Sequence, residues 1–67
     1  MSSTREIEYK GMKVKITVAK TGPMYVGTYA VAETDPLVRG AGADSNSEEG
    51  ALSNAERAAK EAVDRLA

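Results

Sequence analysis

The sequence contains no cysteine and no histidine. The chain therefore has no disulfide, and it lacks the side chains that make most zinc sites, thiol redox centres and nucleophile–base pairs. Carboxylate, lysine, tyrosine and hydroxyl groups remain, but a chain of 67 residues rarely builds the walls that tune a pKa and exclude water. We expect a protein that is not an enzyme and that uses no cofactor and no metal.

Phenylalanine and tryptophan are also absent, and the aromatic residues are three tyrosines. The hydrophobic share of 42% and the charged share of 28% are nevertheless typical of a folded domain. A chain of this length buries only ~60% of the surface that its unfolded form exposes. The sequence therefore predicts a single domain, residues 1–67, with modest stability or with support from a homodimer interface.

Long hydrophobic segments are missing as well. No run of 18 apolar residues occurs, so we expect no membrane-spanning helix. The first six residues lack the apolar segment of a signal peptide, and we expect them to be disordered. The simplest interpretation is a cytoplasmic protein.

Residues 12–33 predict a β-hairpin. Apolar side chains at every second position alternate with more polar ones, Met12, Val14, Ile16 and Val18 against Lys13, Lys15, Thr17 and Ala19. Gly22 and Pro23 predict the turn, because proline cannot donate a hydrogen bond to a β-ladder. Gly11 precedes the hairpin at a change of phase and predicts a bulge or a turn.

The second strand of this hairpin has two alternative phases. In the first, Tyr25, Tyr29 and Val31 face the core with Gly27 between them. In the second, the side chains that face the core are Met24, Val26, Ala30 and Ala32. Both tyrosines then share a face with Lys13 and Lys15. The pattern of side chains does not choose between them.

The C-terminal half predicts a short strand or loop over residues 37–42 and a helix over residues 46–66. Acidic residues follow three candidate N-caps, Ser45, Asn46 and Ser47, and capping-box spacing runs from Ser45 to Glu48 and from Asn46 to Glu49. The apolar positions of the helix recur at intervals of three and four, namely Leu52, Ala55, Ala59, Ala62, Val63 and Leu66. We predict an α+β fold in β-β-β-α order, with a three-stranded antiparallel sheet and one C-terminal helix packed on one face.

Charge is divided unevenly along the chain. Residues 1–23 carry a net charge of +3 and residues 24–67 a net charge of −4. The candidate site for a partner or a nucleic acid combines lysines with tyrosines that stack on bases, and consists of Lys10, Lys13, Lys15, Lys20, Tyr25 and Tyr29. The alternative is that the lysines are a solvated face or protect an edge strand from aggregation while the tyrosines lie in the core.

A set of acidic residues is the second candidate, Glu33, Asp35, Asp44, Glu48 and Glu49. Paired carboxylates can bind a divalent cation or act as acid and base, but no EF-hand spacing is present. Turn and cap positions already explain these residues, so we expect structural roles.

A three-stranded sheet with one helix leaves a second face and two edges for a partner. We therefore predict a non-enzymatic binding module whose partner is a protein, either another chain or a second copy of this one. Binding of RNA or single-stranded nucleic acid through a lysine and tyrosine face is the alternative. No membrane partner is expected.

Residues 48–55, Glu-Glu-Gly-Ala-Leu-Ser-Asn-Ala, match a helix start of the form E-E-A-L-x-N-A with Gly50 inserted. Together with the strand, strand, short strand, helix order over residues 12–66, this segment resembles the N-terminal domain of HicB-type antitoxins and a group of small uncharacterised bacterial proteins of the same layout. The resemblance implies a protein-binding module that sequesters a toxin ribonuclease.

Overall fold

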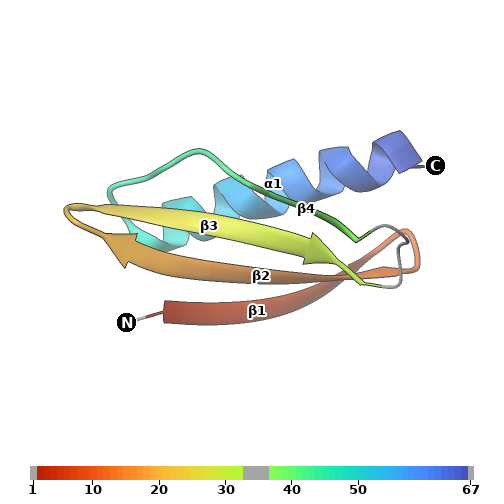
Figure 1. Ribbon diagram of the computed structural model, residues 1–67, viewed down its shortest axis with the longest axis horizontal. Helices are drawn as coiled ribbons and strands as arrows, with labels where there is room; N and C mark the ends of the chain where they lie inside the picture. Colours follow the sequence, from red (N-terminus) through yellow and green to blue (C-terminus); the bar gives the residue numbers. More distant parts are fainter. Residues whose placement is uncertain (1, 33–36, 67) are drawn as a thin grey trace.

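The computed structural model describes residues 2–32 and 37–66, in which one helix lies across one face of an antiparallel sheet (Figure 1). The strands follow one another in the sheet in chain order, and each pairs antiparallel with the next. They are β1 (Ser2–Tyr9), β2 (Met12–Thr21), β3 (Met24–Val31) and β4 (Val38–Ala41), and α1 (Glu48–Leu66) follows. The α+β class, the antiparallel sheet and the single C-terminal helix are confirmed.

The sheet has four strands, so the prediction of three was wrong. The additional strand is β1, formed by residues that we expected to be largely disordered. Lys10 and Gly11 have φ of 52° and 78°, the positive pair of a two-residue type I′ turn, and Tyr9 pairs with Met12 across it. Because two residues separate these partners, the alternation changes phase at the turn. The phase change that we read at Gly11 is therefore a hairpin.

The hairpin between β2 and β3 is confirmed. Gly22 has a φ of 62°, and Pro23 follows it with a ring-fixed negative φ, the order required by a type II′ turn. Thr21 pairs with Met24 across this turn. The expected end of the hairpin at Glu33 lies outside the described residues.

The core lies between α1 and the sheet. Val14, Ile16 and Val18 of β2 and Val31 of β3 are buried against a helix face that consists of Ala51, Ala55, Ala59, Ala62 and Val63. The predicted helix face was wrong at its C-terminal end, where Leu66 is 49% exposed. Leu52 is half-buried and packs on the core as predicted, and Ala51, which was not predicted, is fully buried. The bulky core side chains therefore come mainly from the sheet.

The N-cap of α1 is Ser47. Its Oγ accepts a hydrogen bond from the backbone N–H of Gly50 at 3.0 Å, which is the N3 position of the helix. Ser47 is one of the three candidate caps, whereas the capping-box spacing points to Ser45 and Asn46, one or two residues earlier. Ser45 instead supports the turn before the helix, because its Oγ accepts a hydrogen bond from the N–H of Ser47 at 3.3 Å.

Glycine and alanine set the distance between α1 and the sheet. A Cβ atom on Gly27 would lie 2.7 Å from the carbonyl oxygen of Ala51 in α1. It would also lie 2.7 Å from the Cβ of Ala55. A Cβ on Gly42 would lie 2.5 Å from the backbone nitrogen of Ala55. The backbones of β3, the segment after β4, and α1 thus meet where no side chain larger than hydrogen fits.

We expect Gly27→Ala to lower the free energy of unfolding by about 1 to 3 kcal/mol, because the added methyl group overpacks the contact with α1. Urea denaturation followed by circular dichroism measures this loss. Gly40→Ala is the matched control, since its Cβ would meet the side chain of Tyr29, with the nearest atom at 2.7 Å, and that ring can move. An equal or larger loss at Gly40 would contradict the close approach at Gly27.

Candidate functional site

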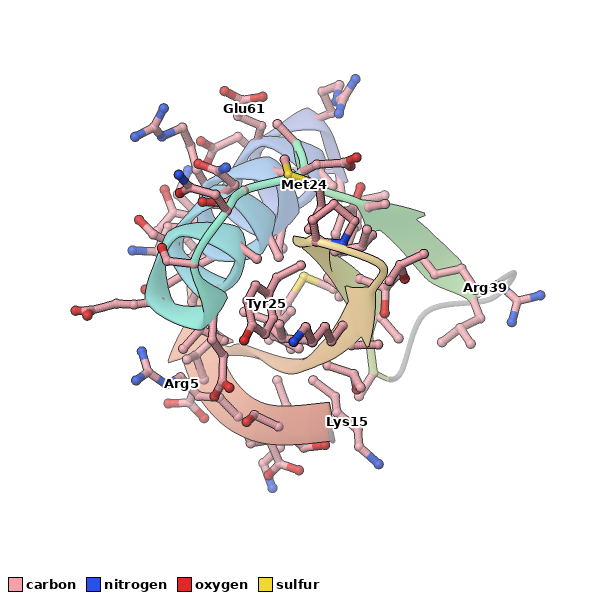
Figure 2. All side chains as sticks on the ribbon, turned by 90° about the vertical axis from the view of Figure 1, so that its left-hand side faces the viewer. Arg5, Lys15, Met24, Tyr25, Arg39 and Glu61 are labelled. Atoms are coloured by element: carbon pink, nitrogen blue, oxygen red, sulfur yellow. The ribbon has the colours of Figure 1, made fainter. Side chains whose placement is uncertain are left out.

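The two faces of the sheet differ in character. The register places Tyr25, Gly27, Tyr29 and Val31 of β3 opposite Lys20, Val18, Ile16 and Val14 of β2, on the face that carries α1. The first of the two alternative phases of this strand is therefore the observed one. Figure 2 shows Tyr25 in the space between the curved sheet and the helix.

The other side of the sheet, which we call the open face, carries no helix among the described residues. Lys15 and Arg39 point away from α1 on this side (Figure 2). The described side chains of the open face are Thr4, Glu6 and Glu8 from β1, Lys13, Lys15, Thr17, Ala19 and Thr21 from β2, Met24, Val26, Thr28 and Ala30 from β3, and Arg39 and Ala41 from β4.

The register divides these side chains into rows that run across the strands. One row carries charge at both margins and contains Glu6, Lys15, Ala30 and Arg39. The next contains Thr4, Thr17, Thr28 and Ala41, and the one beyond it pairs Ala19 with Val26. The middle of the open face is thus made of small and β-branched side chains, and the longer charged side chains lie at the end of the face that contains Glu6, Lys15 and Arg39.

A shallow hollow of about 470 Å³ lies over β2, β3 and β4 on this face. Thr17, Thr28 and Ala30 form part of its lining, and Lys15 and Arg39 stand beside them. The small side chains in the middle of the face leave this space open.

Two glutamates and two lysines oppose each other on β1 and β2. Glu6 pairs with Lys15 in register, and Glu8 pairs with Lys13. None of these four side chains forms an ion pair in the described part of the chain, and neither does Arg39. All five charged groups are exposed and can be directed toward a partner.

The structure separates the six predicted site residues into two groups. Lys13 and Lys15 lie on the open face, whereas Tyr25 and Tyr29 lie on the helix side. The ammonium nitrogen of Lys20 lies 6.0 Å from the ring centre of Tyr25, so these two form a cation–π pair at one end of the sheet. A shared platform of lysines and tyrosines is therefore not formed. Arg39 was missed, because its face depends on its pairing with β3.

Lys10 belongs to a cluster that attaches the first hairpin to the end of α1. Its Nζ lies 2.5 Å from Oδ1 of Asp64, and the hydroxyl of Tyr9 donates a hydrogen bond to the same oxygen at 3.2 Å. The hydrogen bond and charge of Asp64 raise the pKa of Lys10, and the hydrogen bond from Lys10 lowers the pKa of Asp64. Lys60 contributes its Nζ 5.6 Å from the ring centre of Tyr9.

Two further polar contacts join β1 to α1. The hydroxyl of Ser3 donates a hydrogen bond to Glu48 at 2.5 Å, and Arg5 lies 3.7 Å from a carboxylate oxygen of Glu56. Ile7 lies between Arg5 and Tyr9 on the same face of the strand and packs on the core. Polar side chains thus hold an edge strand that buries little apolar surface.

The acidic candidates do not converge on one point. Among the described residues no group of three acidic, histidine or cysteine side chains could hold a metal ion. Glu48 and Glu49 occupy the first turn of α1, where the helix dipole favours acids, and Asp44 is exposed before it. Glu33 and Asp35 lie outside the described residues. No helix in residues 2–32 and 37–66 is both long and apolar enough to span a bilayer.

Comparison of the chain with protein-family models, with curated proteins and with solved structures found no match. The resemblance to HicB-type antitoxins therefore rests on residues 48–55 and on the order of the elements.

We expect Asp64→Asn to lower thermal stability at neutral pH, because it removes the charge that holds Lys10 and weakens the acceptor of Tyr9. Since the pKa of Asp64 is lowered in the folded state, its contribution is present above the ordinary aspartate pKa and is lost as pH falls through the folded value. Lys10 also stabilises the folded state, but the pH dependence of its contribution is reversed. Because its pKa is raised in the folded state, this contribution is present below the ordinary lysine pKa and is lost as pH rises through the folded value.

Melting temperatures across pH, with a carboxyl NMR titration, measure both effects. The difference from the wild type should disappear in acid, and Lys10→Gln should bring the pKa of Asp64 back toward its usual range. Asp44→Asn is the control, because Asp44 has no charged partner in the described part of the chain. An equal effect at Asp44 would contradict the assigned role of the cluster.

Proposed function

We propose that this chain is a non-enzymatic binding module that contacts a protein partner through the open face of its sheet. The observation that supports the proposal is the uneven covering of the sheet: α1 packs on one face, and the residues that the structure describes form no layer on the other. A middle of small side chains lets another backbone approach closely, and the charged margin selects the partner's orientation.

The edges of the sheet favour binding less than its face does. β1 is an edge strand with Arg5, Glu6 and Glu8 along it, and charged side chains of this kind discourage strand addition. β4, the other edge strand, has four residues and offers few backbone groups to an added strand. The open face extends over all four strands.

A protein suits this face better than a nucleic acid does. Stacking of unpaired bases requires aromatic side chains, and the described residues place none on the open face. Glu6 and Glu8 lie beside Lys13 and Lys15, so phosphate groups would meet both signs of charge. The resemblance to antitoxins points in the same direction, because it implies a toxin ribonuclease, which is a protein, as partner.

The test is site-directed photo-cross-linking in cells that express the full chain. A photoreactive amino acid at Thr17 or at Thr28 lies on the open face, and one at Ser53 is the control on an exposed side of α1. We expect both open-face positions to give the same protein adduct, identified by mass spectrometry, and Ser53 to give none. Adducts from Ser53 alone, adducts to RNA in place of protein, or no adduct at either open-face position would contradict the proposal.

A further inference from the structure

We propose that the partner of the open face is a second copy of this chain, stacked face to face about a two-fold axis that runs parallel to the strands. This inference rests on the proposed function, because it assigns a partner to the same surface. It is carried by the order of charges across the four strands.

A rotation about this axis reverses the order of the strands and keeps each row at its own height. β1 of one copy then lies over β4 of the other, and β2 lies over β3. In the charged row, Glu6 comes to lie over Arg39 of the second copy, and Lys15 over Ala30. Opposite charges meet at both margins of the row, and the long lysine side chain meets the smallest side chain of the row.

The neighbouring rows match in the same way. Thr17 comes to lie over Thr28 of the second copy, and Thr4 over Ala41. In the row beyond, Ala19 meets Val26. None of these rows brings like charges together, and the middle of the interface is lined by small and β-branched side chains that permit a close approach.

Other two-fold arrangements of the same surface lack this complementarity. An axis perpendicular to the strands stacks each strand on its own copy, so Glu6 and Glu8 face only β1 of the second copy and never Lys15 or Arg39. Antiparallel pairing of two β1 edges with both helices on one side also keeps Glu6 and Glu8 away from Lys15 and Arg39, and the register that pairs Glu6 with Glu6 brings like charges together. Charge therefore selects the face-to-face arrangement with the axis along the strands.

The size of the face indicates a weak dimer. Three strands of about eight residues and a fourth of four residues, about 4.8 Å apart, give a patch of roughly 450 Å² per copy, or about 900 Å² for the pair, which is the size of weak interfaces. The sheet curves around α1 (Figure 2), so the contact centres on β2 and β3. The long side chains of Glu6 and Arg39 then span the wider gap at the margins.

Sedimentation equilibrium over a range of concentrations tests the arrangement with a charge exchange. Glu6→Arg and Arg39→Glu each place like charges opposite one another, and we expect each to weaken dimerisation by about tenfold or more. The double variant restores opposite charges with their positions exchanged, and we expect its dissociation constant to return to within about threefold of the wild type. High salt should weaken the wild-type dimer.

Glu61→Arg is the matched control, because it makes the same change of charge at an exposed position of α1 that lies outside the open face (Figure 2). It should leave the dimer unchanged, and amide NMR spectra confirm that every variant is folded. Single variants that do not weaken the dimer, or a double variant that stays as weak as the singles, would overturn the pairing.

A wild-type chain that stays monomeric overturns the second copy as partner. If Thr28 still cross-links to a different protein, the chain remains a binding module with another partner. If Thr28 cross-links to no protein, the proposed function fails as well.

Discussion

The close contact between α1 and the sheet is the constraint on which the rest of the structure depends. Gly27 of β3 and Gly42 after β4 bring two extended segments against the backbone of α1 near Ala51 and Ala55. A helix that approaches so closely can present little more than methyl groups, which explains why four of its five buried residues are alanine. The bulk needed to fill the core then comes from the valines and the isoleucine of the sheet.

This contact also determines how the two faces of the sheet are used. In the part of the chain that the structure describes, α1 covers one face of the sheet. The small and charged residues of the opposite face are therefore in contact with solvent. The tyrosines, which are the largest side chains of the chain, are drawn to the helix side, where Tyr29 covers Gly40 and packs on the core. The open face is left with charge and with hydroxyl and methyl groups, which suits recognition by a surface of complementary charge.

β1 illustrates how a marginal edge strand is held without a large apolar surface. Apart from Ile7 and the ring of Tyr9, the described links from β1 to α1 are polar contacts from Ser3, Arg5 and the Tyr9 hydroxyl, all on the face of the strand toward α1. Exposed pairs of this kind each contribute little, so most of the strand's stability comes from its ladder with β2. A partner on the open face would add support where the chain itself buries little.

The sequence by itself determined the elements whose signals are local. The alternation over residues 12–19, the turn at Gly22 and Pro23, and the acid-led helix each depend on residues close in the chain, and all three are confirmed. Tertiary structure decided what depends on distant partners. β1 is too polar for its alternation to indicate a strand until β2 pairs with it, and the phase of β3 follows from the fit of Gly27 against Ala51 and Ala55. The same packing placed Tyr25 and Tyr29 on the face opposite Lys13 and Lys15. It also brought Arg39 into one row with Glu6. The physical reason is that the register between strands, and not proximity in sequence, decides which side chains share a face of a sheet.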